Sequence, residues 1–257
     1  MPTLESERFA LHMPPRHAGA VLDQDEEWCE IEMHGARRRI RLHDYAAIYD
    51  VPGLYEQLFA ERLRCASPQV VCELLGEQLA AAGARQATMG VLDFGAGNGM
   101  IGEQLDKTGF GTIVGVDLLP EARAAALRDR PGIYDDYHVV DLTAPDPAER
   151  AILERGDFDC LVCVAALGFG DVPMLAFAEA FNLVDSPGWL AFNVRDKILE
   201  QERDGFGGLI ERMCSEGVIE ERARRQYTHR LSIAGEPLDY VAIVATKARD
   251  IPLDWVR

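Results

Sequence analysis

The feature that most constrains the fold is a regular alternation of short apolar runs and segments with helical spacing, which starts near residue 89. The apolar runs predict buried β-strands at residues 90–94, 112–116, 137–140, 158–165 and 189–194. The segments between them predict helices at residues 100–107, 120–128, 145–154 and 172–184. Strands joined by helical crossovers pair in parallel, so this pattern predicts a parallel sheet with helices on both faces.

The last part of the chain is expected to complete this sheet. A helix is predicted over residues 197–216, followed by strands at 227–233 and 240–246 that a short Ala-Gly-Glu-Pro segment connects. So short a connection forces one of the two strands to run antiparallel. The expected fold class is therefore α/β, a Rossmann-like, doubly wound and mostly parallel seven-stranded sheet with an antiparallel terminal strand.

The residues before this pattern are expected to form an arm and a cap. Residues 1–26 contain prolines, scattered charge and an acidic run, which is typical of a flexible arm. Residues 28–33 and 37–42 alternate in polarity on either side of a turn and predict a hairpin. Residues 44–64 have helical spacing, interrupted at Val51-Pro52-Gly53. We expect a helical and hairpin cap at the N-terminus.

These observations predict a single folded domain over residues 27–257. The cap would occupy residues 27–66, and a ligand-binding core would occupy residues 67–257. Ser67-Pro68 is expected to start the first core helix, with Ser67 as the N-cap and proline at the first helical position.

Composition limits the classes of partner. The 26 basic and 43 acidic residues give a net charge of −17, which repels phosphate backbones, so no nucleic-acid partner is expected. No apolar stretch approaches the roughly 18 residues of a membrane span, so no membrane partner is expected. The N-terminus lacks the apolar region of a signal peptide, and the protein is expected in the cytoplasm. The sequence does not indicate an oligomeric state.

The cysteines are not expected to bind metal. Cys160-Leu-Val-Cys163 has the C-x-x-C spacing but lies in an apolar run, with no second pair or nearby histidine to complete a zinc site. Thiols in such a run act as small hydrophobic side chains.

Three aspartates mark the ends of the first three predicted strands. Asp93, Asp117 and Asp141 follow one another at intervals of 24 residues, which is one βα unit each. The carboxyl ends of parallel strands meet at one edge of the sheet, where open α/β folds bind their ligands. Asp117 and Asp141 could instead be helix N-caps, since aspartate is common at that position.

A glycine-rich loop follows the first strand. Asp93 is followed by Gly95, Gly97 and Gly99, which allow a tight turn and a close approach of ligand to backbone. A dinucleotide fingerprint would need glycine where Met100 stands. An acid before the loop does not suit a diphosphate, but it suits a cationic ligand such as the ammonium of a methionyl group. Asn98 could cap the next helix and also contact that ligand.

Together these motifs resemble the class I S-adenosylmethionine-dependent methyltransferases over about residues 88–195. Asp93-x-Gly95-x-Gly97-x-Gly99 is similar to the first motif of the family. Val114-Gly115-Val116-Asp117 is similar to the second motif, and Val139-Val140-Asp141-Leu142 to the third. A patchier similarity, through segments such as Arg64…Ser67-Pro68, relates the chain to a methyltransferase-like protein of the Williams–Beuren region and its bacterial relatives.

The resemblance implies roles for the matching residues. The glycine loop would cradle the methionine and ribose portions of S-adenosylmethionine, and Asp117 would accept hydrogen bonds from both ribose hydroxyls. Asp141 and the Leu142 N–H would bind the adenine edge, while the main chain near Ala165 would face the methyl donor. The expected cofactor-binding residues are Tyr45, Tyr49, Asp93, Gly95, Ala96, Gly97, Asn98, Asp117, Leu118, Asp141, Leu142 and Ala165.

Residues 43–64 are expected to form a lid over this site. Tyr45 and Tyr49 are four residues apart and share one face of a helix, from which both can reach a ligand. The alternative is a cap helix whose tyrosines only pack on the sheet. His229, on a late strand, is interpreted as a surface or core histidine in preference to a general base.

The expected function is transfer of a methyl group from S-adenosylmethionine to an oxygen, nitrogen or carbon atom of a small molecule, with S-adenosylhomocysteine as the product. The sequence singles out no catalytic residue, since the reaction depends chiefly on alignment. One alternative is a methyltransferase-like protein that binds the cofactor without catalysis, as a regulatory or scaffold subunit. The other is a nicotinamide-dependent oxidoreductase.

Overall fold

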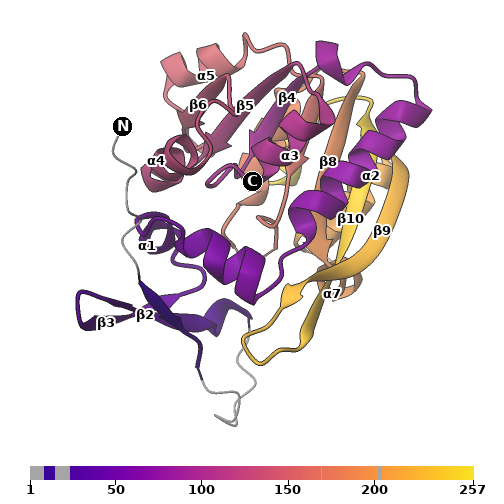
Figure 1. Cartoon of the computed structure of the whole chain (residues 1–257). Coiled ribbons are helices and arrows are strands. Elements are labelled where there is room, and N and C mark those ends of the chain that lie inside the picture. Colours follow the sequence, from indigo (N-terminus) through magenta and orange to yellow (C-terminus); the bar gives the residue numbers. More distant parts are fainter. Residues whose placement is uncertain (1–8, 15–23, 169, 202–203) are drawn as a thin grey trace.

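The computed structural model describes residues 9–14, 24–168, 170–201 and 204–257. A seven-stranded sheet runs through its centre (Figure 1), in the order β6-β5-β4-β7-β8-β10-β9. The strands are β4 (Gly90–Phe94), β5 (Thr112–Asp117), β6 (Asp136–Val139), β7 (Cys160–Cys163), β8 (Gly188–Arg195), β9 (Ile219–Leu231) and β10 (Pro237–Lys247). The first five pair in parallel, and β10 pairs antiparallel with both β8 and β9. The predicted fold class is confirmed.

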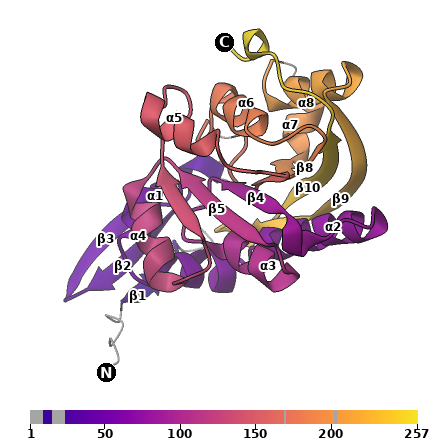
Figure 2. The same ribbon diagram turned by 90° about the horizontal axis from the view of Figure 1, so that it is seen from above.

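Helices cover both faces of the sheet (Figure 2). One face carries α2 (Ser67–Ala81), α3 (Met100–Thr108) and α4 (Pro120–Asp129). The other carries α5 (Pro147–Leu153), α6 (Met174–Asn182), α7 (Asp196–Gln201) and α8 (Phe206–Ser215). Each layer buries its own cluster of aliphatic and aromatic side chains against the strands, which supplies most of the driving force for folding. The carboxyl ends of the parallel strands extend beyond these two helical layers to a cavity.

Two elements near the C-terminus differ from the sequence-based expectation. The helix expected over residues 197–216 is two helices, because Gly205 adopts an extended backbone conformation directly before α8. Strand β9 has 13 residues, where a strand over 227–233 was expected. Its first half is rich in charged residues, five of the seven from Ile219 to Arg225, as suits a solvated edge strand, so an apolar pattern does not reveal it.

A smaller sheet lies beneath the open edge of the large one (Figure 1). Its strands are β1 (Ala10–His12), β2 (Trp28–Met33) and β3 (Ala36–Arg41), in that order and all antiparallel. The β2–β3 pair confirms the predicted hairpin. The helix α1 (Tyr45–Tyr49) and the π-helix η2 (Glu56–Arg62) follow, and their apolar side chains share one buried cluster with the hairpin.

The described part of residues 1–26 differs from the expected flexible arm. Residues 10–12 pair with β2, and residues 24–26 form the 3₁₀ helix η1 (Gln24–Glu26). The Gln24 amide donates a hydrogen bond of 3.1 Å to the Tyr240 hydroxyl of β10. Backbone pairing and packing against the cluster of the small sheet therefore hold these residues on the molecule. Local composition does not predict these contacts, because they are made with residues that lie far away in the sequence.

Among the described helices, none is long and apolar enough to cross a membrane.

Candidate functional site

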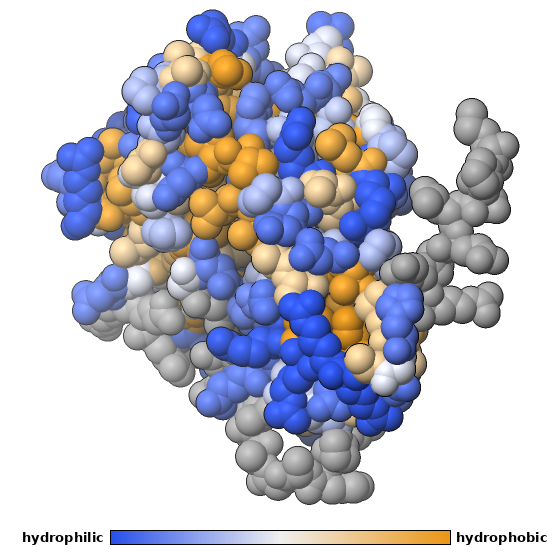
Figure 3. Space-filling view, turned by 90° about the vertical axis from the view of Figure 1, so that its left-hand side faces the viewer, coloured by the Kyte–Doolittle hydropathy of each residue, from blue (hydrophilic) through white to orange (hydrophobic). Residues whose placement is uncertain are grey.

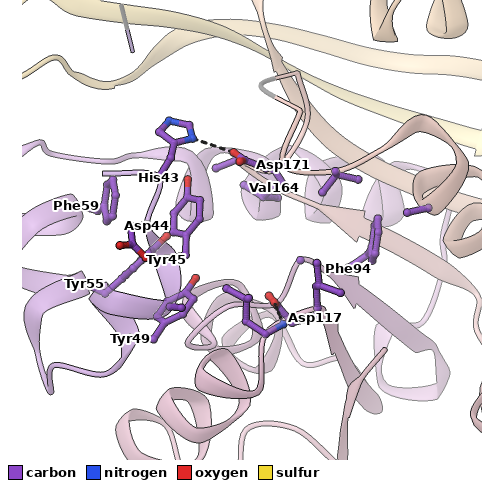
Figure 4. Close-up of a pocket in the computed structure, with 18 of the residues that line it drawn as sticks. His43, Asp44, Tyr45, Tyr49, Tyr55, Phe59, Phe94, Asp117, Val164 and Asp171 are labelled. Atoms are coloured by element: carbon purple, nitrogen blue, oxygen red, sulfur yellow. Dashed lines mark hydrogen bonds and ion pairs between the residues drawn. The ribbon is translucent and has the colours of Figure 1, made fainter. Parts of the chain in front are cut away.

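A cavity of about 380 Å³ lies where the carboxyl ends of the parallel strands meet the N-terminal cap (Figure 4). The sheet side of the cavity is formed by residues 94–95, 117–119, 140–142 and 164–166, which follow β4, β5, β6 and β7. The opposite side is formed by α1, η2 and the end of β9. This is the location that the parallel topology predicts for a ligand.

Asp117 lies on the sheet side of this cavity and is held by backbone donors. The Gly97 N–H donates a hydrogen bond of 2.9 Å to Asp117 Oδ2, and the Leu119 N–H donates one of 2.9 Å to Oδ1. Burial raises the pKa of the Asp117 carboxyl, and these backbone hydrogen bonds oppose that effect. A carboxylate offers about four lone-pair sites, so both oxygens keep capacity for ligand hydroxyls. Leu118 beside it is 59% exposed and lines the cavity.

Hydrophobic side chains are also present on the molecular surface. On the face shown in Figure 3, hydrophobic residues lie mainly towards the middle, with hydrophilic residues around them.

The glycine loop after β4 approaches α1 closely. Gly97 has a φ of +54°, and a Cβ atom built on it would lie 2.5 Å from the Tyr49 hydroxyl oxygen. Glycine is therefore required at position 97 for both conformation and space. Gly95, Ala96, Gly97 and Asn98 line a second, smaller cavity of about 40 Å³ that lies against the first, since Tyr49, Gly95 and Ala165 border both.

Asn98 ties this loop to the cap through residues that the sequence did not single out. Its side-chain amide donates a hydrogen bond of 2.6 Å to Glu56 Oε1 of η2. Arg130 Nη1 lies 2.7 Å from the same Glu56 oxygen and donates to the Asn98 carbonyl at 3.1 Å. Asn98 is only 2% exposed, so its expected part as a helix cap is replaced by this contact across the loop.

Asp93 does not line either cavity. Its side chain is fully buried beneath the loop, where Oδ2 accepts a hydrogen bond of 2.7 Å from the Tyr134 hydroxyl. Its other oxygen, Oδ1, has no hydrogen-bond partner among the described residues. Burial raises the pKa of this carboxyl to about 7, and the Tyr134 hydrogen bond opposes that rise. The direct contact with an ammonium group that the sequence suggested is not available in this arrangement, because the protein encloses the carboxyl.

Asp141 and Leu142 both line the main cavity after β6. Asp141 is exposed and shapes its own turn, since Oδ1 accepts hydrogen bonds from the Thr143 N–H at 2.9 Å and from the Thr143 hydroxyl at 2.6 Å. These hydrogen bonds lower the pKa of the Asp141 carboxyl. Asp141 therefore stabilises a turn and borders the cavity; the helix N-cap interpretation is wrong, because Asp146 holds that position before α5.

Aromatic side chains form the cap side of the cavity (Figure 4). The rings of Tyr45 and Tyr49 are stacked with centroids 6.2 Å apart, as their spacing on one helix face predicts. Tyr49 stacks on Tyr55 at 5.3 Å, and Tyr55 contacts Phe59 at 4.7 Å. Burial raises the pKa of both Tyr45 and Tyr49 above that of a free phenol, so both hydroxyls stay protonated and can donate hydrogen bonds.

Sequence reasoning missed a buried polar network that joins four segments of the chain. The Ala165 N–H donates a hydrogen bond of 2.6 Å to Asn193 Oδ1 of β8, and Asn193 Nδ2 contacts Ser67 Oγ at 3.0 Å and Tyr227 Oη at 2.7 Å. Ser67 Oγ lies 2.6 Å from His229 Nδ1. The helix α2 has Ala66 at its N-cap position, so the expected capping role of Ser67 is wrong: its hydroxyl turns inward to this network.

The network fixes an unusual backbone at the cavity. Ala165 has a φ of +58°, a left-handed conformation that costs a residue with a Cβ atom roughly 1–2 kcal/mol. The short hydrogen bond to Asn193 holds it there and turns the chain after β7 into the cavity. Its position borders both cavities, as the expected methyl-donor region should.

His229 and Arg230 bring charge and polarity to the far end of the cavity. His229 lines the cavity, and burial, with a smaller effect from Arg230, lowers its pKa to about 3. Arg230 Nη2 forms a buried ion pair of 2.6 Å with Glu27 Oε2, whose other carboxylate oxygen accepts the Ile233 N–H at 2.7 Å. The expectation that His229 is merely a surface or core residue is therefore incomplete, since it is buried and also faces the cavity.

A second link closes the cavity from the side. His43 Nδ1 lies 2.9 Å from Asp171 Oδ2, which joins the residues just before α1 to the segment after β7 (Figure 4). Among the described residues, no group of three or more His, Cys, Asp or Glu side chains is arranged to hold a metal ion.

Several solved structures share this fold at low sequence identity. An S-adenosylmethionine-dependent methyltransferase from Clostridium acetobutylicum is 13% identical, with a TM-score of 0.52 over 76% of this chain and 96% of that protein. The N-methyltransferase NodS of Bradyrhizobium japonicum, solved with S-adenosylhomocysteine, is 14% identical, with a TM-score of 0.51 over 74% and 91%. A Pyrococcus horikoshii protein proposed to be an RNA methyltransferase is 16% identical, with a TM-score of 0.52 over 74% and 89%. These similarities establish the fold.

The family follows from the sequence itself. No curated protein matches the chain significantly, so the relationship to the Williams–Beuren protein stays a prediction. The chain does match a methyltransferase domain family over residues 61–229, which is well over half of its length and includes every strand of the parallel part of the sheet. The chain belongs to this methyltransferase family, and it is a class I enzyme that depends on S-adenosylmethionine.

Proposed function

We propose that the enzyme methylates a small molecule that it encloses between the ends of the strands and the cap. The observation that carries this proposal is that one cavity has two different sides. Its sheet side presents Asp117, Asp141 and backbone groups, whereas its far side presents the buried residues His229, Arg230 and Tyr240 together with aromatic rings. The first side suits the cofactor, and the second suits an acceptor.

The residues on the sheet side fit S-adenosylmethionine. Asp117 has lone pairs left over from its two backbone hydrogen bonds, and these would accept the ribose hydroxyls. Asp141, Leu142 and Leu118 would surround the adenine ring. The glycine loop, from Gly95 through Ala96 and Gly97 to Asn98, would hold the methionyl end in the smaller adjoining cavity.

Asp93 would act on the same cofactor from a distance. Its enclosed carboxyl cannot contact the ammonium directly, but when ionised it places negative charge beneath the loop. The cofactor carries a net positive charge, and Coulomb attraction over a few ångströms in a buried site favours it.

The far side of the cavity favours a small acceptor over a macromolecular one. A volume of about 380 Å³ lies near the lower end of the range for small-molecule pockets, roughly 300–1,000 Å³. The cap, the β9 end and the His43–Asp171 link enclose it on several sides. The net charge of −17 opposes nucleic acids. We further propose that the enzyme works in the cytoplasm.

Methyl transfer requires the side chains mainly to align the acceptor atom with the methyl group. The bound sulfonium supplies an electrophilic methyl group. The chain contributes by holding the acceptor atom in line with that carbon and by excluding water, which together lower the barrier. Tyr45, Tyr49 and Phe59 supply the apolar wall that would exclude water on the cap side. No described side chain needs to bond covalently to the substrate.

Two experiments test the proposal in sequence. In a thermal-shift assay, S-adenosylmethionine and S-adenosylhomocysteine should raise Tm, while NAD and NADP should not; ligand at roughly 100 times its Kd adds about 2.7 kcal/mol of stability. The protein is then incubated with a cell extract that contains metabolites, RNA and protein, and with S-adenosylmethionine bearing a labelled methyl group. A labelled product of low mass supports the proposal. Label only in RNA or protein contradicts it, and cofactor binding with no product supports a non-catalytic role.

A further inference from the structure

The polar network behind Ala165 determines where its protons lie. A backbone N–H can only donate, so Asn193 Oδ1, 2.6 Å from the Ala165 nitrogen, must be the acceptor. The orientation of the Asn193 amide follows from this. Its NH₂ group donates one hydrogen bond to Ser67 Oγ at 3.0 Å and the other to Tyr227 Oη at 2.7 Å.

The two hydroxyls of the network have one proton each. Ser67 Oγ and Tyr227 Oη lie 2.6 Å apart, and Ser67 Oγ also lies 2.6 Å from His229 Nδ1. Every proton in the network is used when Tyr227 donates to Ser67 and Ser67 donates to His229. In the reverse direction the Tyr227 proton has no acceptor among the described residues, and a buried donor without a partner is costly.

This direction of donation assigns the tautomer of His229. Nδ1 accepts the Ser67 proton, so the imidazole must carry its own proton on Nε2. The ring stays neutral, because burial lowers its pKa to about 3. Nε2 has no hydrogen-bond partner among the described residues, and His229 lines the cavity. The nitrogen available to a ligand is therefore a donor.

We propose that His229 binds the acceptor substrate by donating a hydrogen bond from Nε2 to a lone pair of a carbonyl, carboxylate or phenolate oxygen, and that it does not act as a general base. This inference rests on the proposed function, whose acceptor site it describes. In this role His229 orients the substrate. The proton of the methylated group then leaves to solvent, or the group enters already ionised.

The neighbours of His229 fit such a substrate. Arg230, next along β9, also lines the cavity, and because Glu27 balances its charge the pair adds polarity to the far side without a net charge. The Tyr240 ring lies against the imidazole with centroids 4.2 Å apart, which holds the plane of the ring. Tyr45 and Phe59 add flat apolar surface across the cavity. These contacts predict a small, flat molecule that carries an oxygen able to accept the Nε2 hydrogen bond.

The tautomer can be measured without any substrate. Histidine labelled with ¹⁵N in the protein bound to S-adenosylhomocysteine gives separate long-range ¹H–¹⁵N patterns for the two neutral tautomers and for the charged ring. His229→Gln identifies the signal. We expect the Nε2–H form throughout pH 5.5–8. The Nδ1–H form, or a titration within that interval, would overturn the assignment.

Two variants of the network provide a matched comparison. Ser67→Ala removes the hydroxyl donor to Nδ1 and leaves only the weaker Cys65 thiol, whose Sγ lies 3.8 Å away, so the His229 signal should change to a mixture of tautomers. Tyr227→Phe leaves Asn193 and Ser67 in place, so Ser67 can still donate and the Nε2–H form should persist. If Ser67→Ala leaves the tautomer unchanged, the network does not set it and the inference fails. Thermal melts of both variants establish that they are folded.

Measurements of methyl transfer in the cell extract distinguish a hydrogen-bond donor role of His229 from a general-base role. His229→Gln retains an N–H donor and should keep product formation within about tenfold of the wild type, whereas His229→Leu should lose more than that. Equal loss in both variants would contradict a donor role. Calorimetry with S-adenosylhomocysteine tests the proposed function separately: absence of binding to the wild type refutes that function, while the tautomer measurement still decides the inference.

Discussion

The hydroxyl of Tyr49 occupies the space into which a side chain at position 97 would extend, since a Cβ atom on Gly97 would lie 2.5 Å from it. This contact joins the cap to the glycine loop. The cap and the loop are therefore already packed together without a ligand. Tyr49 is 6% exposed and borders both cavities. The expectation of a lid over residues 43–64 can therefore be tested at this one contact.

The first prediction is that the cap becomes more protected when ligand binds. Hydrogen exchange over residues 43–64 should slow when S-adenosylhomocysteine is added, because a lid that closes on a ligand opens less often. Tyr49→Ala should weaken binding by about tenfold, while Tyr49→Phe, which keeps the ring, should weaken it less. Unchanged exchange together with unchanged affinity in both variants would mean that the tyrosines only pack on the sheet.

The second prediction concerns Asp117. Asp117→Ala should weaken S-adenosylmethionine binding by at least about tenfold, because it removes charge-assisted hydrogen bonds worth roughly 1.5–3 kcal/mol each. It also frees the Gly97 and Leu119 N–H groups, so the loop should loosen. Asp141→Ala is the matched comparison: its carboxyl is exposed and the Leu142 N–H stays in place, so the loss should be smaller. Isothermal calorimetry measures both, and equal losses would argue against a special role for Asp117.

The third prediction is a pH dependence of stability that originates in Asp93. Folding raises the pKa of this carboxyl from 3.8 to about 7, so the folded state binds more protons than the unfolded state between those values. The free energy of unfolding should therefore fall as pH rises from about 4 to 7, by roughly 4 kcal/mol at most. Asp93→Asn keeps a partner for Tyr134 and cannot ionise. Urea titrations should show that the variant loses this part of the slope; an identical slope would locate the effect elsewhere.

The fourth prediction concerns the buried ion pair at the end of β9. Glu27→Ala leaves Arg230 charged and only 3% exposed, which should cost about 3–5 kcal/mol. Because Arg230 follows His229, this variant should also disturb the far side of the cavity. Glu220→Ala breaks the Glu220–Arg222 pair, in which the glutamate is 73% exposed, and should cost at most about 1 kcal/mol. Similar costs in thermal or urea unfolding would show that burial does not decide the effect.

The order of the main strands and the sheet side of the site could be predicted from local sequence patterns. The bounds of β4 agree with the expectation residue for residue, and Asp117 and Asp141 line the cavity as expected. These features are local, because a strand depends on its own apolar run and the parallel order brings successive strand ends to one edge. The four-residue spacing of Tyr45 and Tyr49 likewise predicts that their side chains lie on one helix face, and their rings are stacked there.

The residues that enclose the site depend on contacts between distant segments, which local patterns do not predict. Asp93 directly precedes the loop in sequence, yet its carboxyl is fully buried, accepts a hydrogen bond from Tyr134 and lines neither cavity. Ser67 and His229 are 162 positions apart, and their contact exists only because α2 packs beside β9 and β10. No local sequence pattern predicts whether the Ser67 hydroxyl caps its own helix or points towards a distant strand. The spacing of residues along the chain predicts which side chains share a helix face and where strands end. The pairing of buried polar groups depends on how distant helices and strands pack against one another.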